Sequence, residues 1–234
     1  MPAPRRPAPA SDTREERKYP ISDARAPLFR AWLNARLRPD PQYPDGVISS
    51  CYFDTPGLDA YWESADGQLV KHKLRLRWYG DPIDPFAGAW LELKSRDGAI
   101  SSKQRLRFAA QGQSLGEGVF LPDRERLTEV LQNLDPSAPP VLEATALIRY
   151  RRERWRDPAS GLRVSLDTNV RIAPPRPGPA WRPLPRGAVL ELKSSGPLPP
   201  RLRGLGRFGL QRTAHSKYAL AVEQLLGGVR ARTA

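Results

Sequence analysis

Lysine and arginine recur at every second residue in three consecutive segments, KHKLRLRWYG, WLELKSR and SSKQRLRF, between residues 71 and 108. Successive side chains of a β-strand point to opposite faces, so in each segment the charges share one face and the leucines share the other. Like charges that face one another across neighbouring strands are destabilising. One such strand would be the solvated face of a sheet, but three in succession predict that an anion lies between them.

The same alternation returns nearer the C-terminus, in VLEATALIRYRRERWR, GLRVSLDTNV and VLELKS. Arginine offers a bidentate fork and lysine a compact charge, which suits the oxygens of a phosphoryl group during transfer. A hard oxygen donor such as Glu191 suits Mg²⁺ or Mn²⁺. The sequence contains no P-loop or Gly-rich phosphate cradle, so we expect side chains to bind any phosphate.

The composition favours a partner with many negative charges. The 234 residues include 38 Lys and Arg against 25 Asp and Glu, a formal net charge of +13, which predicts affinity for nucleic acid, an anionic membrane or polyphosphate. The single Cys51 excludes an internal disulfide, and no Cys and His residues have zinc-site spacing. We expect no secretory signal and no membrane span, so that membrane contact would need a membrane-protein partner.

We expect one cytoplasmic domain over residues 13–227, between a disordered Pro- and Ala-rich arm at residues 1–12 and a tail at residues 228–234. The sequence leaves the oligomeric state open.

The elements that position the charges are mainly strands. Alternation predicts seven or eight of them, with hairpin turns at residues 97–98 and 158–161. Helical spacing predicts three amphipathic helices, over residues 22–37, over residues 123–134 and after Ser216. These helices need apolar surface, and only the uncharged side of the strands offers it. The prediction is an α+β, mainly β fold, an eight-stranded antiparallel tunnel barrel with a charged lumen, flanked by amphipathic helices.

Nine short motifs, in the order ERKY, YFDT, KLRLRWYG, ELKSR, SSK, YRRERW, RVSLDTNV, ELKSS and SKY, resemble the VTC domain. This family of polyphosphate polymerases is a branch of the triphosphate tunnel metalloenzymes and is related to CYTH proteins. The ordered series covers roughly residues 14–226 and is far more specific than any one motif. The resemblance implies a tunnel that binds a nucleoside triphosphate and polyphosphate with Mn²⁺ or Mg²⁺, and that moves the γ-phosphoryl group onto the growing chain.

The resemblance also implies roles for individual residues. Catalytic positions are matched by Arg75, Arg77, Lys94, Arg152 and Arg163. Phosphate-binding positions are matched by Lys18, Lys103, Tyr150, Ser216 and Lys217, and Lys193 joins them because it shares a strand face with Glu191. Glu191 itself matches the metal-binding glutamate. We expect Glu16, Arg105 and Asp167 near this site, and His72 and His215 outside its chemistry.

Two positions depart from the relatives. Hydrolytic CYTH proteins begin with Glu-x-Glu-x-Lys, but here Arg14 precedes Glu16 and Lys18, which removes a metal ligand and disfavours a triphosphatase. The polymerase pattern has a further lysine three residues before Lys217, where this chain has Ala214. Phosphate binding is therefore indicated more strongly than chain elongation.

Three other functions use the same features. A nucleic-acid-binding barrel would stack bases on aromatic residues, but we expect Trp78, Trp90 and Phe108 on the apolar side of their strands, so no nucleic-acid partner is expected. An inorganic triphosphatase and a non-catalytic domain that binds polyphosphate or a nucleotide would both use the tunnel.

Overall fold

The computed structural model describes residues 15–80, 89–98, 100–108, 112–116, 119–135 and 142–227. Arg14, the predicted disordered arm and the predicted tail lie outside these residues.

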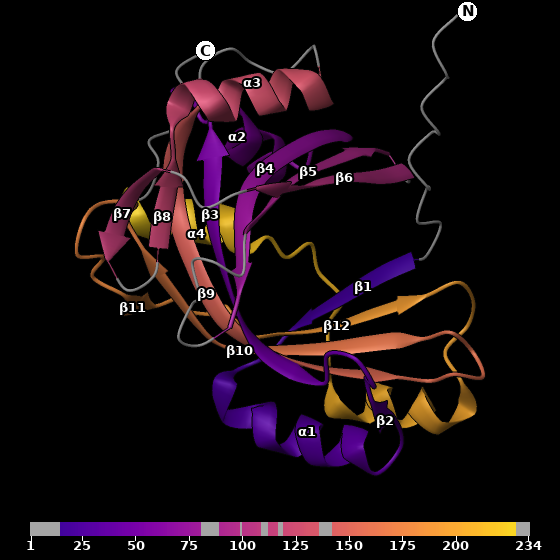
Figure 1. The fold of residues 1–234 in the computed structure, drawn as a ribbon. Coiled ribbons are helices and arrows are strands. Elements are labelled where there is room, and N and C mark those ends of the chain that lie inside the picture. The colour runs from indigo at the N-terminus through magenta and orange to yellow at the C-terminus, as the bar shows by residue number, and fades with distance from the viewer. Residues whose placement is uncertain are drawn as a thin grey trace, which may run out of the picture.

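Eight strands form one antiparallel sheet that curls into a half-barrel (Figure 1), in the order β1-β12-β10-β9-β3-β4-β5-β6. Their bounds are β1 (Glu15–Pro20), β3 (Asp45–Asp54), β4 (Val70–Tyr79), β5 (Ala89–Asp97), β6 (Ile100–Phe108), β9 (Glu143–Arg156), β10 (Arg163–Ala173) and β12 (Val189–Ser194). Short strands pair with β9 and β10, namely β2 (Arg38–Pro39) and β11 (Arg182–Pro183), and a separate hairpin joins β7 (Gly112–Gly116) to β8 (Val119–Pro122). The predicted mainly β, antiparallel tunnel fold is confirmed.

Strand alternation places charge on the concave face of this sheet. In the ladder between β4 and β5, Arg75 lies opposite Glu92 and Lys73 opposite Lys94. The intervening leucines point outward into a core cluster with Trp78. The hairpin between β5 and β6 turns at Gly98, whose φ of 54° is a left-handed conformation that glycine adopts without strain.

Helices cover the convex face at two places, as the amphipathic patterns predict. Helix α3 (Arg124–Leu134) begins after Asp123, whose carboxylate accepts hydrogen bonds from two amides of the first turn. Its buried Leu127 and Leu131 belong to the same core cluster as Leu76. Figure 1 shows α3 and α1 on opposite sides of the curled sheet.

The first predicted helix is a short 3₁₀ turn, η1 (Asp23–Arg25), followed by α1 (Ala26–Asn34). A long 3₁₀ segment that was not predicted, η3 (Pro200–Phe208), packs beside α1, with 5.0 Å between the ring centroids of Phe208 and Phe29. Phe29 of α1 shares a core cluster with Leu166 of β10. The outer side of this half of the sheet is therefore apolar and covered.

The third helix, α4 (Lys217–Leu225), contradicts the expectation that every helix covers the outer face. Tyr218 of α4 stacks on Tyr52 with 5.0 Å between ring centroids, and Tyr52 lies directly opposite Arg75 in the ladder of β3 and β4. Residues paired in this way share one face of the sheet. Helix α4 thus closes one end of the concave face, because β3 and β9 are apolar on both faces there, with Ile48 and Ile148 in the same cluster.

A further helix, α2 (Asp59–Ala65), was not predicted. Its amides at Ala60 and Tyr61 donate hydrogen bonds to the carboxylate of Asp54, the last residue of β3. Leu58, at the N-cap position, has a left-handed conformation and makes no side-chain cap. The usual sequence signal of a helix start is therefore missing. No helix in the described part of the chain is long and apolar enough to cross a membrane.

Candidate functional site

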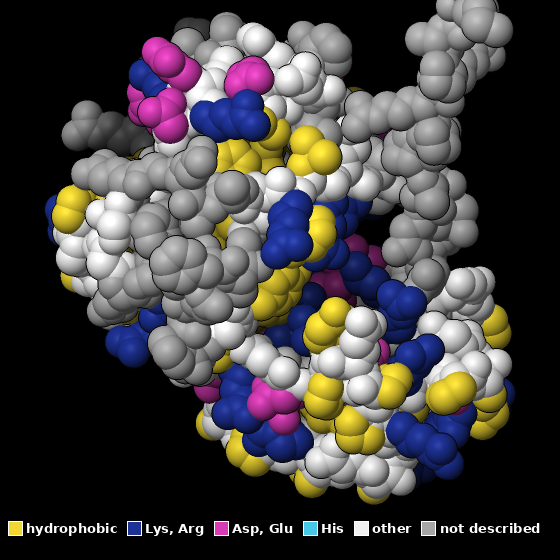
Figure 2. All heavy atoms as spheres, in the orientation of Figure 1, with side chains coloured by type: hydrophobic (Ala, Val, Ile, Leu, Met, Phe, Trp, Pro, Cys, Tyr) yellow, Lys and Arg dark blue, Asp and Glu magenta, His cyan; other side chains and the backbone are white. Residues whose placement is uncertain are grey.

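The concave face carries most of the predicted site residues, and Lys and Arg side chains gather around a hollow there (Figure 2). Three carboxylate centres hold these cations in place, and they lie on different strands. Each centre is built by residues far apart in the sequence.

The first centre is Glu92 on β5, only 1% exposed. Its carboxylate accepts hydrogen bonds from Arg75 at 2.7 and 2.9 Å and from Lys103 at 2.6 Å, and Arg77 lies 3.5 Å away. Burial raises the pKa of Glu92, but the three cations together hold it well below its usual value. Glu92 is therefore an ionised anchor, and it was not among the predicted site residues.

Hydroxyl groups complete the anchoring of the two arginines. Arg75 donates to the hydroxyl of Tyr52 at 2.9 Å, and Arg77 donates to the hydroxyl of Tyr150 at 3.3 Å. These contacts fix the planes of the guanidinium groups, so little side-chain entropy remains to be lost when an anion binds. Tyr52 was not among the predicted site residues either, although it belongs to the YFDT motif.

The second centre is Asp167 on β10, which is fully buried. Arg152 donates to both carboxylate oxygens, at 2.6 and 2.7 Å, and Lys217 donates to one of them at 2.6 Å. Burial raises the pKa of Asp167, but Arg152 and Lys217 lower it to about 2 overall. Ser216 caps α4 and accepts a hydrogen bond from Lys73 at 3.1 Å. The start of α4 thus delivers two of the predicted residues to the hollow.

The third centre is a pair of carboxylates on neighbouring strands, Glu16 of β1 and Glu191 of β12. In the ladder of these strands Lys18 lies opposite Glu191 and Glu16 opposite Lys193. Lys193 reaches Glu191 at 3.3 Å and Glu16 at 3.9 Å, while Lys18 and Lys94 reach Glu16 at 3.1 and 3.3 Å. Burial raises the pKa of Glu191, but the surrounding cations hold it well below its usual value.

This pair fits the ligand set of a divalent cation that also binds phosphate. Mg²⁺ is usually held by one or two carboxylates together with substrate phosphates and water, not by a cage of protein groups. The described residues contain no group of three or more His, Cys, Asp or Glu that could hold a metal by itself. A cationic group, the ammonium of Lys193, already lies between Glu16 and Glu191, which shows that the pair accommodates positive charge.

Arg163 lies apart from these centres. It is exposed at the start of β10, opposite Arg156 and Lys193 in the ladders on either side, and it makes no ion pair with a described residue. It shares the strand face of Asp167, so it belongs to the rim of the hollow. Arg77, Arg152, Lys94 and Lys103 lie inside it.

One expectation about aromatic residues is wrong. Trp90 lies on the charged face, because it has the strand parity of Glu92, and the guanidinium of Arg105 stacks 3.7 Å from the centre of its ring. Trp78 and Phe108 do lie in the outer core cluster. The aromatic argument against nucleic-acid binding therefore holds for two of the three residues only.

The profile of the VTC domain family matches residues 13–226. This chain belongs to the VTC domain family. The match covers all three carboxylate centres and the helix that closes the hollow.

One solved structure shows the same fold. A candidate adenylyl cyclase from Hippeastrum, HpAC1, described as having a dominant triphosphatase activity, is 18% identical, with a TM-score of 0.52, and the alignment covers 93% of this chain and 98% of that chain. A candidate adenylate cyclase from Vibrio parahaemolyticus is 13% identical, with a TM-score of 0.45 and coverage of 88% and 96%. A comparison with curated proteins returns no significant match.

Proposed function

We propose that this VTC domain is a metal-dependent phosphotransferase, which moves the γ-phosphoryl group of a nucleoside triphosphate onto a polyphosphate chain in the cationic hollow. The observation that carries the proposal is the convergence of Arg75, Arg77 and Lys103 on one buried carboxylate, Glu92, beside the carboxylate pair of Glu16 and Glu191. The arrangement supplies fixed positive charge for phosphate and oxygen ligands for a metal.

The fixed arginines are suited to stabilising the transition state of phosphoryl transfer, and not only to attracting an anion. Phosphoryl transfer asks a protein mainly to position the reacting groups and to stabilise the charge on the equatorial oxygens. Arg75 is held by Glu92 and Tyr52, and Arg152 is held by Asp167. Because these guanidinium groups are already oriented, they need no reorganisation when charge develops on a bound phosphate.

In the proposed reaction a terminal oxygen of the polyphosphate acceptor attacks the γ-phosphorus. The bond from the γ-phosphorus to the β,γ-bridging oxygen breaks, and its electron pair stays on the β-phosphate of the departing nucleoside diphosphate. The acceptor chain gains one phosphate. Lys18 lies beside the carboxylate pair and Lys217 beside Asp167, where each neutralises negative charge of the bound phosphates. Arg163 binds the polyphosphate chain at the rim of the hollow.

Glu16 and Glu191 would hold Mn²⁺ or Mg²⁺, which when bound neutralises charge on the transferring and leaving oxygens. The buried, unpaired Cys51 is compatible with a reducing compartment, and we expect the protein to act in the cytoplasm.

A second candidate uses the same residues with water as the acceptor. The Hippeastrum structure is described as a dominant triphosphatase and shares the fold, and Glu16 is retained here next to Glu191. In this reaction the γ-phosphoryl group is released as inorganic phosphate. The two reactions differ in acceptor and not in the cationic site.

The deciding experiment incubates the protein with ATP and Mn²⁺ or Mg²⁺, with and without a short polyphosphate primer, and resolves the phosphate products by length. The proposed polymerase lengthens the primer and releases ADP in equal amount. Inorganic phosphate without longer chains identifies a triphosphatase. If polyphosphate binds but no nucleotide is consumed with either metal, the domain binds its ligand without catalysis.

A further inference from the structure

A row of cations crosses the end of the sheet on the strands β2, β9, β10 and β12. Each member lies directly opposite the next in the ladders of neighbouring strands, and we call the set the rim row: Arg38, Arg156, Arg163 and Lys193. Residues that are paired in this way share one face of the sheet.

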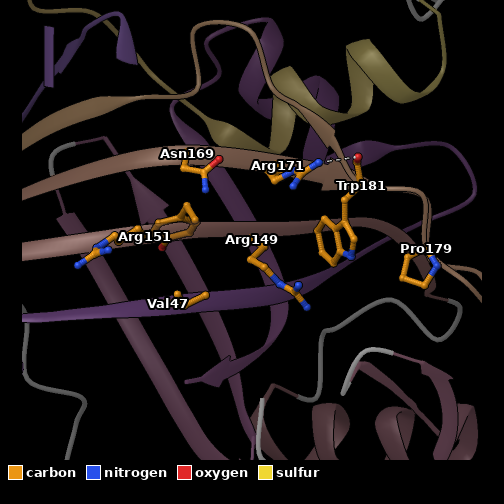
Figure 3. Close-up of a pocket in the computed structure, with 8 residues that line it drawn as sticks. Val47, Arg149, Arg151, Asn169, Arg171, Pro179 and Trp181 are labelled. Carbon is orange, nitrogen blue, oxygen red and sulfur yellow. Dashed lines mark hydrogen bonds between the residues drawn. The ribbon is translucent and has the colours of Figure 1, made fainter. Parts of the chain in front are cut away.

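The rim row faces the hollow. The ammonium of Lys193 lies 3.3 Å from the carboxylate of Glu191, and Arg156 has the strand parity of Arg152, which lies on the concave face. Arg151 has the other parity and lines a pocket on the outer side of β9 (Figure 3). The rim row therefore extends from the third carboxylate centre to the short strand β2.

The rows further inside the hollow contain carboxylates, and the rim row does not. One inner row runs from Arg154 through Ser165 to Glu191, and the next pairs Arg152 with Asp167. The rim row places a cation on each of its four strands. Like charges directly opposite one another are destabilising, so an anion bound along the row would relieve this repulsion.

One carboxylate lies beside the row without forming an ion pair with it. Burial raises the pKa of Asp40, but the backbone amides of Tyr43 and Gln42, together with the charges of Arg156 and Arg154, lower it overall. The arginines of the rim row make no ion pair with a described residue, so Asp40 is a counter-charge that they share at longer range.

A small pocket lies at the β2 end of the row. Arg38 and Arg156 line it together with Arg201 and Asp157, and its volume is about 200 Å³. Asp157 forms an ion pair with Arg201 and accepts a hydrogen bond from Ser160 at 2.6 Å. This carboxylate is therefore already satisfied. The volume is below the range of small-molecule sites, so the pocket suits a phosphate group of a chain better than a whole nucleotide.

The rim row lies at the open end of the hollow. Helix α4 packs in one cluster with Ile148 of β9 and Ile172 of β10. Arg156 and Arg163 lie at the opposite ends of the same two strands. A chain that is bound in the hollow and is too long for it must therefore leave on the side of the rim row.

We infer that the rim row binds a polyphosphate chain where the chain leaves the hollow, and that it makes the domain prefer long chains to tripolyphosphate. Guanidinium groups match phosphate oxygens with paired hydrogen bonds. Neighbouring strands lie about 4.8 Å apart, so the backbone of the row spans about 14 Å, enough for several phosphate units. The inference rests on the proposed function, because it takes polyphosphate as the ligand of the hollow.

The test compares tripolyphosphate with a long-chain polyphosphate in calorimetric titrations of the full chain, without nucleotide. The wild type is expected to bind the long chain more tightly. The double variant Arg38→Ala, Arg156→Ala should weaken long-chain binding roughly tenfold, as expected for two exposed ion pairs. It should leave the affinity for tripolyphosphate unchanged, because both residues lie outside the three carboxylate centres. The salt dependence of long-chain binding should become shallower, since fewer counterions are released.

The matched control is Arg203→Ala, Arg207→Ala, which removes the same charge from exposed positions of η3. This control should bind both ligands as the wild type does. Unfolding temperatures establish that each variant is folded. Arg38→Ala alone, at an exposed position, repeats the test if the double variant does not fold.

The inference is overturned if the double variant and the control bind the long chain equally well, or if the double variant loses affinity for both ligands in parallel. It is also overturned if single-stranded DNA loses affinity in the same proportion as the long chain, which would identify a general basic surface. Failure of the transfer reaction gives a different result. If the double variant loses long-chain affinity alone but the wild type consumes no nucleotide, the rim row stands and the proposed transfer is wrong.

Discussion

At the scale of a single residue, Glu191 is the proposed metal ligand, so a change there should affect metal placement and leave phosphate binding in place. We predict that Glu191→Gln binds polyphosphate at least as well as the wild type, because it removes a negative charge from a cationic hollow. Turnover should fall on the order of a hundredfold or more, as expected when stabilisation of transition-state charge is lost. Binding titrations and single-turnover assays measure the two effects separately.

Arg75→Ala should instead weaken both binding and turnover, since in the proposed reaction Arg75 contacts phosphate before and during transfer. The control Glu129→Gln changes an exposed carboxylate on α3, whose one ion pair with a described residue is to Arg126, and it should change neither. If Glu191→Gln keeps full metal-dependent turnover, Glu191 is only an ion-pair partner of Lys193 and the proposed metal role is wrong.

Lys103 gives the hollow a pH dependence. Burial lowers the pKa of Lys103, Glu92 opposes that effect, and the resulting value is about 8. The ammonium is therefore charged below pH 8 and loses its charge as the pH rises through 8. We predict that ATP affinity falls between pH 7.5 and 9 and that binding at pH 8 takes up protons, because a bound phosphate stabilises the charged form.

Calorimetry in buffers of different ionisation enthalpy measures this uptake. Lys103→Arg keeps its charge over the whole range, so its proton uptake should be smaller than that of the wild type. Lys73, whose pKa is lowered by burial to about 8, should contribute to what remains. Tyr52 should also contribute, because burial raises its pKa but Arg75 and Arg77 lower it overall to about 8. Equal proton uptake in Lys103→Arg and in the wild type would contradict the assignment.

At the scale of elements, Asp54 joins three parts of the fold. Asp54 is the last residue of β3. Its carboxylate accepts hydrogen bonds from two amides in the first turn of α2 and from the hydroxyl of Tyr218 in α4. We predict that Asp54→Ala lowers the free energy of unfolding by about 2–4 kcal/mol, because several buried donors lose their partner at once.

Urea denaturation measures the loss. Tyr218→Phe removes one of these hydrogen bonds and keeps the ring that stacks on Tyr52, so it should cost about 1 kcal/mol. If the two variants are equally destabilised, the carboxylate does not hold α2 in place.

At the scale of the whole molecule, the net charge of +13 attracts any polyanion, but the hollow is closed at one end by α4. We predict that single-stranded DNA of matched charge displaces polyphosphate poorly, and that both ligands bind more weakly as salt is added. Competition titrations at fixed salt measure the preference. DNA that displaces polyphosphate as readily as polyphosphate displaces itself would indicate a general basic surface, with Trp90 as a base-stacking residue.

The sequence by itself determined which side chains share a strand face, because that depends only on a period of two. The charged rows of β4, β5 and β6, the outward leucines, the hairpin at Gly98 and the Ser216 cap of α4 are all local, and all are found in the structure. The ordered motifs likewise sufficed for the family.

Only the tertiary structure decided what each face meets. Strand parity puts Glu92 and Arg75 on the same face of the sheet. It does not show that Lys103 reaches the same carboxylate, because the reach of side chains across three strands is not a local property. The placement of α4 on the concave face depends on an apolar patch contributed jointly by β3 and β9. The local alternation of residue types determines which side chains share a face of the sheet. The packing of elements that are distant in the sequence determines which part of a face forms a site.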